Sequence, residues 1–350
     1  MTFLILLLAI AAVAAAGVGL ANYWANTAHG RIRPIFAFAF KMQGVFQPKT
    51  LEGALTMAPM NTPEERAKAR ADFAKNVAPM SKPVAFDGTI EDRVLDGPGG
   101  KFSVRVYTPP GSGPFPLMVY MHGGGFIVGT PEYTDGATRT IASLAPAVVV
   151  SVDYRLSPEV RYPGAIEDCE FAIQWCTQNS SELKIKPGPI AVGGDSAGGN
   201  LAAVLSQRDQ TSGRNQIGLQ VLIYPAVDWS RRDRESQIAF ARGYGLSLQD
   251  IANCFDYYAP DGADARDPGL SPIFAASFTG QPRALVFTAG FDVLRDEGTE
   301  YAELLEKAGV EVEHIREPHV PHGYITMTRL CKEAGDSLER IAGAIGRLSA

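Results

Sequence analysis

Residues 189–200 read PIAVGGDSAGGN, with a single serine, Ser196, among four glycines. The four residues before the first glycine have no polar side chain and predict a buried strand, and the NLAAVLSQ that follows suits a helix. The GDSAG within this stretch fits G-x-S-x-G in the strand–turn–helix setting of a nucleophile elbow. Such a tight turn needs glycine, because a side chain would clash and the backbone dihedrals are unusual. The Ser196 hydroxyl is therefore expected above the carboxyl edge of a sheet. The other interpretation, a phosphate-binding turn, lacks the P-loop lysine and the G-x-G-x-x-G spacing.

Apolar runs like this one recur from about residue 89 onward, with helix-compatible stretches between them. Continuous apolar runs suit parallel strands that are covered on both faces, and strand–helix alternation favours a doubly wound sheet. The runs are PLMVYMHGGG (116–125), PAVVVSVDYRL (146–156), LQVLIYPAVD (219–228) and RALVFTAGFD (283–292). We therefore predict an α/β chain with a mostly parallel central sheet flanked by helices.

The segment 228–272 interrupts this alternation, because no convincing strand occurs in it. It lies between two predicted core strands, which suggests a helical insertion above the sheet, and residues 25–90 also read as helices and loops. Together the two segments are expected to form a cap. The predicted organisation is an apolar N-terminal segment (1–24), the N-terminal part of the cap (25–90), the first part of the catalytic domain (91–227), the cap insertion (228–270) and the second part of the catalytic domain (271–350).

Composition limits the classes of partner. The 350 residues carry a formal net charge of −6, which argues against nucleic acid, since nucleic-acid binding calls for a basic patch. The four cysteines form no CxxC pair, so a metal site is not expected, and buried free thiols are the favoured interpretation.

Residues 3–21 contain no charged or strongly polar side chain, and Tyr23 and Trp24 follow as aromatic residues do at a membrane interface. Three interpretations compete. The run is a membrane anchor, a cleaved secretory signal, or a helix packed on the body or a partner. Membrane association is the favoured one, with secretion to the periplasm or medium as the alternative, although no Lys or Arg precedes the run as a signal peptide requires.

A serine nucleophile needs a base and an orienting acid, and in this fold class the chain order is Ser, acid, His. His322, in a loop after the last predicted strand and followed by glycine, is our choice for the base, with His319 as the second candidate. Asp292 comes directly after the preceding strand. Asp296 and Glu297 are nearby but better suited to the start of a helix, where acids favour the dipole.

The tetrahedral intermediate also needs hydrogen-bond donors for its oxyanion, and bare peptide amides supply them. The glycines at 123–125 end an early strand and can turn their N–H groups toward the serine. Ala197, directly after the nucleophile, supplies another N–H. His122 is expected to fix this loop by hydrogen bonding rather than to take part in the chemistry.

The assembled motifs resemble the hormone-sensitive-lipase-like family of α/β-hydrolases, also called bacterial family IV esterases. They run in order from about Val104 to the C-terminus. They are HGGGF (122–126), DYRLSPE (153–159), GDSAGGN (194–200), DVLRDEG (292–298) and HGY (322–324). The resemblance implies a triad of Ser196, Asp292 and His322. It also implies Gly124, Gly125 and Ala197 as oxyanion donors, and no cofactor.

The activity that the resemblance implies is hydrolysis of short- to medium-chain carboxylic esters by a serine carboxylesterase with a helical cap. Three alternatives stay open: amide or carbamate hydrolysis, an arylacetamide-type deacetylase on the same triad, and a non-catalytic ligand receptor. The partner is a small-molecule ester, and a homodimer is possible because many relatives pair through a sheet edge. Four aromatic residues of the cap insertion either line an acyl pocket or form cap core, the second being favoured. They are Trp229, Phe240, Tyr244 and Phe255.

Overall fold

An eight-stranded sheet organises the chain in the computed structural model, which describes residues 15–46 and 60–349. Its strand order is β10-β9-β8-β7-β5-β6-β4-β3, and the neighbours from β6 through β10 run parallel. The strands are β3 (Thr89–Gly97), β4 (Gly100–Thr108), β5 (Leu117–Met121), β6 (Val148–Asp153), β7 (Ile190–Asp195), β8 (Ile217–Ile223), β9 (Arg283–Phe291) and β10 (Val312–Pro321).

The predicted α/β architecture is confirmed, and the apolar runs explain it. All five residues of β5 and all six of β7 are buried, as expected for strands with helices on both faces. At one edge of the sheet the pairing is antiparallel, since β4 runs antiparallel to both β3 and β6. There β3 carries charged residues and the 68%-exposed Val94, which suits a strand with one solvated face.

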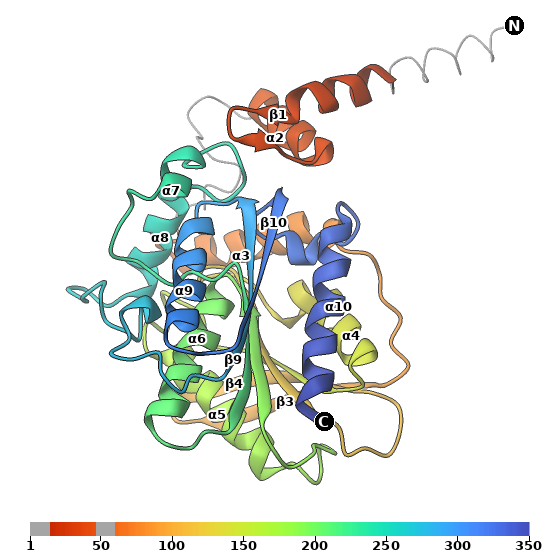
Figure 1. Ribbon diagram of the computed structural model, residues 1–350, viewed down its shortest axis with the longest axis vertical. Coiled ribbons are helices and arrows are strands. Elements are labelled where there is room, and N and C mark those ends of the chain that lie inside the picture. Colours follow the sequence, from red (N-terminus) through yellow and green to blue (C-terminus); the bar gives the residue numbers. More distant parts are fainter. Residues whose placement is uncertain (1–14, 47–59, 350) are drawn as a thin grey trace, which may run out of the picture.

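Helices cover the sheet on both faces. Figure 1 shows α4 and α10 together on one side and α6 and α9 on the other. The helices are α2 (Pro34–Phe46), α3 (Pro63–Val77), α4 (Pro131–Leu144), α5 (Gly164–Gln178), α6 (Ala197–Thr211), α7 (Glu235–Ala239), α8 (Leu248–Tyr258), α9 (Arg295–Lys307) and α10 (Lys332–Gly346). Short 3-10 turns are η1 (Ala78–Met80), η2 (Pro272–Phe274), η3 (Tyr324–Thr326) and η4 (Arg347–Ser349).

In the two predicted cap segments the described residues form helices and loops, except for two short paired strands at 26–27 and 30–31 and the first two residues of β3. Residues 228–272 contain α7 and α8 and no strand. In the N-terminal part, α3 begins with a complete capping box between Thr62 and Glu65 and a proline at its first position. The segments touch, since the Met60 N–H donates to the Tyr257 hydroxyl at 3.1 Å. The domain boundaries themselves stay a prediction.

The described N-terminal residues form a helical hairpin. Residues 15–24 are helical, two short strands follow, β1 (Asn26–Thr27) and β2 (Gly30–Arg31), and α2 completes it. Of the apolar run 3–21, residues 3–14 lie outside the described residues. Across 15–46 and 60–349, no single helix is both long and apolar enough to cross a bilayer.

All four cysteines are buried and unpaired, in agreement with the favoured interpretation. Burial raises the pKa of each thiol above its usual value, so none of them is a reactive thiolate.

Candidate active site

The nucleophile elbow forms at the join of β7 and α6, near the middle of the sheet. Ser196 stands between the two elements with φ 57° and ψ −115°, a conformation that side-chain-bearing residues rarely adopt. Its N–H donates to the Ile223 carbonyl of β8 at 2.9 Å, which holds the strained turn against the sheet. The hydroxyl is thereby presented at the carboxyl edge, at the start of a helix.

Neighbouring backbone explains why glycines surround the serine. A Cβ added to Gly194 would lie 2.2 Å from the Met121 carbonyl oxygen, and one added to Gly198 would lie 1.9 Å from that same atom. This atom belongs to the main chain of the adjacent β5, which cannot move aside as a side chain can. The strand and the elbow helix therefore approach each other in a way that only glycine allows.

The three side chains predicted for the triad meet at this edge. His322 Nε2 lies 2.9 Å from Ser196 Oγ, and His322 Nδ1 lies 2.7 Å from Asp292 Oδ2. Asp292 is 1% exposed, and its second oxygen accepts the Leu294 N–H at 2.9 Å. The acid directly follows β9 and the imidazole directly follows β10, two neighbouring parallel strands, so their carboxyl ends bring the two groups together.

The alternative residues lie elsewhere. His319 was expected after the last strand, but β10 extends through it to Pro321, and its Nδ1 lies 2.7 Å from the Arg31 carbonyl oxygen. Asp296 accepts the Ser236 N–H at 2.7 Å, and Glu297 accepts the Val227 N–H at 2.8 Å. Both acids therefore hold the start of the 228–272 segment rather than the imidazole.

The HGGG loop lies against the elbow. Gly124 has φ 117° and Gly125 has φ 60°, and a Cβ on Gly124 would lie 2.1 Å from the Val128 carbonyl oxygen. A Cβ on Gly125 would lie 2.3 Å from Cys254 Sγ of α8. Ala197 is buried as the first residue of α6. The loop thus needs glycine for its dihedrals and for close contact with the segment above it.

A buried carboxylate next to the nucleophile joins this loop to the elbow. Asp195 accepts hydrogen bonds from the Tyr120 hydroxyl at 2.9 Å and from the Gly123 N–H at 3.0 Å. Burial raises its pKa to about 6, although these two donors oppose the shift. Sequence reasoning missed this role. The available signal was an acid inside an otherwise apolar strand end, which needs partners when buried.

His122 holds the other side of the loop. Its Nδ1 lies 2.7 Å from the Gly123 carbonyl oxygen, and its ring stacks on Tyr154 with centroids 4.3 Å apart. Burial lowers the pKa of His122 to about 4, so the imidazole is neutral near pH 7. The contacts agree with the predicted hydrogen-bonding role.

The cap aromatics divide into two groups. Trp229 lies 6.2 Å from Phe126 of the HGGGF motif and 5.7 Å from Phe255, measured between ring centroids. Phe240 and Tyr244 pack instead on Phe291, at 5.4 and 5.6 Å. Trp229 therefore borders the HGGGF motif with Phe255 packed on it, and the second group covers the residue before Asp292.

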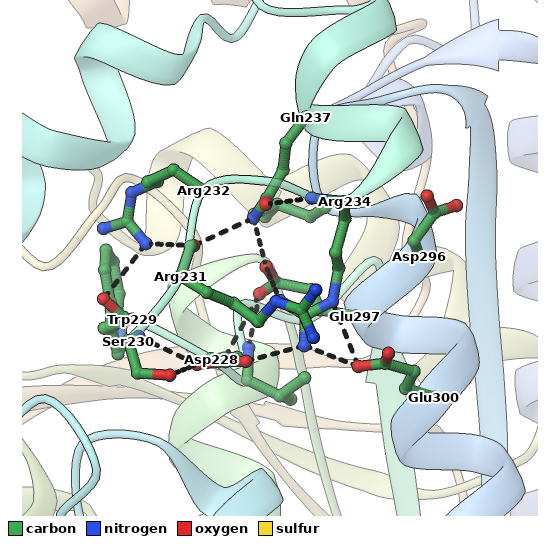
Figure 2. Close-up of polar contacts among 12 residues, drawn as sticks. Asp228, Trp229, Ser230, Arg231, Arg232, Arg234, Gln237, Asp296, Glu297 and Glu300 are labelled. Carbon is green, nitrogen blue, oxygen red and sulfur yellow. Dashed lines mark hydrogen bonds and ion pairs between the residues drawn. The ribbon is translucent and has the colours of Figure 1, made fainter.

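A buried charge cluster fixes the start of the cap insertion to the helix that follows Asp292 (Figure 2). Arg234, 4% exposed at its side chain, donates to Asp228 at 2.6 Å and also pairs with Glu300. Its Nη1 lies 3.9 Å from Glu297 Oε2. Burial raises the pKa of Glu297 to about 8, against the effect of Arg234. The run RRDRE at 231–235 was the sequence signal for this cluster, but its partner Glu300 lies 66 residues from Arg234.

In the described part of the chain, no group of three His, Cys, Asp or Glu side chains is arranged to hold a metal ion.

The chain has clear relatives. Residues 118–326 match a family described by the alpha/beta hydrolase fold. The carboxylic ester hydrolase LipN of Mycobacterium tuberculosis is 39% identical over 247 residues, which cover 69% of this chain and 65% of LipN. The esterase LipI of the same organism is 38% identical over 264 residues, which cover 74% of this chain and 82% of LipI. The chain belongs to the hormone-sensitive-lipase-like family of α/β-hydrolases.

Solved structures of this hydrolase family superpose over most of the chain. A hyperthermophilic esterase from the archaeon Pyrobaculum calidifontis gives a TM-score of 0.77 at 38% identity, covering 81% of this chain and 94% of its own. An ester-hydrolase from the metagenome of Lake Arreo gives 0.81 at 33% identity, covering 89% and 96%. The resemblance inferred from the motifs is confirmed.

Proposed function

We propose that the chain is a serine carboxylesterase that hydrolyses short- to medium-chain esters through an acyl-enzyme. The carrying observation is the continuous contact from Asp292 through His322 to Ser196, at 2.7 and 2.9 Å. The chain is an enzyme of the carboxylic ester hydrolase class, the class named for its relative LipN. Its substrates are small esters. The catalytic roles of the three triad residues and the preference for short to medium acyl chains are our proposal.

Acylation starts at the strained elbow. His322 takes the proton of Ser196 through Nε2 while the hydroxyl oxygen attacks the ester carbonyl. Asp292 holds Nδ1–H, so that the imidazole presents its basic nitrogen to the serine, and it stabilises the imidazolium that forms. The alcohol then leaves with the proton from His322.

The negative charge on the carbonyl oxygen is met by the N–H groups of Gly124, Gly125 and Ala197. In another hydrolase, removing one such donor raised the activation barrier by about 3–4 kcal/mol. Water then attacks the acyl-enzyme, with His322 acting as base again and Ser196 as the leaving group.

Replacing Ser196 with alanine tests the proposal. Hydrolysis of p-nitrophenyl butyrate is expected to fall by a factor on the order of 10⁶, as when a triad serine is removed elsewhere. The matched control is Ser277→Ala, because Ser277 is an exposed serine outside the proposed triad, and this variant should keep full activity. Labelling of the wild type, but not of Ser196→Ala, by a fluorophosphonate probe checks the nucleophile directly. Retained activity in Ser196→Ala would exclude the mechanism.

The alternatives differ in the bond cleaved. Rates on a matched ester and anilide separate an esterase from an amidase or arylacetamide-type deacetylase, and a panel of p-nitrophenyl esters from acetate to palmitate fixes the acyl preference. Absence of any covalent adduct with the fluorophosphonate would favour the receptor. Sedimentation equilibrium tests the predicted homodimer.

For localisation, we propose membrane association through residues 3–21, on their sequence, with secretion after signal cleavage as the alternative. Cell fractionation, together with N-terminal sequencing of the purified protein, distinguishes the two outcomes.

A further inference from the structure

The N-terminal hairpin, residues 15–46, carries a concentration of exposed apolar side chains that is not found elsewhere among the described residues. Of the large hydrophobic side chains that are exposed among the described residues, half belong to this hairpin. They are Val18 at 62%, Leu20 at 48%, Tyr23 at 75% and Ile35 at 44%. On the helical segment 15–24 only Ala21 is buried, and Asn22 is its single strongly polar residue. A helix that is apolar around most of its circumference is stable when something other than water covers it.

The charges of the N-terminal residues indicate that the surface covering this helix is anionic. The first 51 residues contain two arginines, two lysines and no acid, in a chain whose net charge is −6. Arg33 is neutralised by Glu333 at 2.6 Å. Arg31 donates instead to the side-chain oxygens of Asn26 and Asn22, both at 2.9 Å, and Lys41 is exposed. Among the described residues neither Arg31 nor Lys41 has a carboxylate within ion-pair distance.

The hairpin sits next to the triad. The Arg33 N–H donates to the His319 carbonyl oxygen at 2.9 Å, three residues before His322. His29 packs on Phe240 with ring centroids 5.4 Å apart, and Phe240 packs in turn on Phe291, the residue before Asp292. In Figure 1 the hairpin lies beyond the arrowheads of β9 and β10, at the carboxyl edge of the sheet.

We propose that the N-terminal hairpin docks on the surface of an anionic phospholipid bilayer and so turns the carboxyl edge that bears Ser196 toward the membrane. Val18, Leu20, Tyr23 and Ile35 enter the headgroup–acyl boundary, and Arg31 and Lys41 meet the lipid phosphates. Esters dissolved in the bilayer are then the preferred substrates. That last step rests on the proposed function, whereas the docking does not.

Vesicle flotation of the full-length protein tests the docking. The wild type is expected to float with vesicles of phosphatidylcholine mixed with phosphatidylglycerol, and less with phosphatidylcholine alone or at high salt. Lys41→Gln should bind the mixed vesicles about fivefold more weakly, the usual effect of one basic residue at an anionic surface. Lys307→Gln is its control, since Lys307 is also exposed but lies on α9.

The apolar contribution is tested by the double variant Tyr23→Ser/Ile35→Ser. Its affinity for mixed vesicles should fall by at least about tenfold, because two apolar side chains no longer enter the lipid. The control is Val94→Ser/Leu144→Ser, which removes two hydrophobic side chains of 68% and 53% exposure outside the hairpin. Unchanged flotation of Tyr23→Ser/Ile35→Ser would overturn the proposal, as would equal binding to both vesicle types at every salt concentration. A dimer abolished by the same variant, with no flotation of the wild type, would identify a second copy of the chain as the occupant and reject the bilayer.

Kinetics separate this proposal from the esterase assignment. Tyr23→Ser/Ile35→Ser should keep wild-type activity on soluble p-nitrophenyl butyrate and lose activity on dioleoylglycerol held in mixed vesicles by the same factor as its flotation. If the wild type hydrolyses neither ester, the esterase proposal fails, and flotation still decides the docking. Equal rates of the variant and the wild type on vesicle-held ester would refute the link between docking and substrate.

Discussion

Replacing Arg234 with methionine removes the one buried cation from the cluster that joins the cap insertion to α9 (Figure 2). Asp228 and Glu297, each with 2% of its side chain exposed, lose the one guanidinium that lies within 4 Å among the residues that the structure describes. Burial favours protonation of Asp228, but hydrogen bonds from Ser230 and Arg234 keep its pKa below the usual value. Methionine fills a similar volume without supplying a charge, so the variant isolates the electrostatic loss.

The size of the effect follows from the burial. Leaving a buried charge without its partner costs about 3–5 kcal/mol. For 350 residues the entropy of unfolding is about 0.7 kcal/mol per kelvin, so the thermal midpoint should fall by about 4–7 °C.

Differential scanning calorimetry at pH 7 measures this shift. Arg231→Met is the control, because Arg231 neighbours Arg234 in sequence but is paired only at the surface, with Asp233 at 2.6 Å, and its loss should leave the midpoint unchanged. Equal midpoints for the two variants would refute the argument, since they would show that burial of the cluster carries no energetic weight.

Three further outcomes are expected at the site itself. Asp292→Asn should lower kcat for p-nitrophenyl butyrate by about 10⁴, because the amide favours the wrong tautomer of His322; a loss below tenfold would contradict the role of this acid. Gly125→Ala should lower kcat/KM by tenfold or more, since it combines φ 60° with a Cβ placed 2.3 Å from Cys254 Sγ. Adding Cys254→Ala to Gly125→Ala should restore part of the lost kcat/KM. If the losses of the two single variants simply add, the clash with Cys254 is not the cause. The buried Asp195 carboxyl has a pKa of about 6, above its usual 3.8, so it contributes stability below pH 3.8 that is lost as the pH rises through 6. Asp195→Asn, which keeps an acceptor for the Tyr120 hydroxyl, should flatten the plot of thermal midpoint against pH between pH 3.8 and 6. Parallel curves for the variant and the wild type would exclude this contribution of Asp195.

The parts of the site that could be predicted are those set by local backbone geometry and chain order. Ser196 was predictable because an elbow tolerates only glycine at its close approaches, and the sequence displays those glycines directly. Asp292 followed because it comes directly after a recognisable apolar strand, and His322 because the chain order of this fold class places the histidine after the last strand. Parallel strands then bring their carboxyl ends together.

The remaining parts depend on contacts between distant segments. The Asp195 carboxylate is buried beside Tyr120, 75 residues earlier, and nothing in the local sequence names that partner. The approach of Cys254 to Gly125 depends on how α8 is placed above the HGGG loop, which hydrophobic periodicity does not determine. The length of β10 was underestimated for a related reason: its last residues are held by the N-terminal hairpin, through the Arg33 N–H and the His319 carbonyl oxygen.

The close approach of β5 to the elbow has a practical consequence for engineering. The Met121 carbonyl oxygen leaves no room for a Cβ at Gly194 or Gly198, so a library that randomises these two positions would be dominated by unfolded protein. Diversity aimed at new substrates belongs instead at Trp229, whose ring lies beside Phe126 of the HGGGF motif, and at Phe255, which packs on Trp229. Under the proposed function, changes at these two rings would alter the surroundings of the serine while leaving the glycines of the elbow in place.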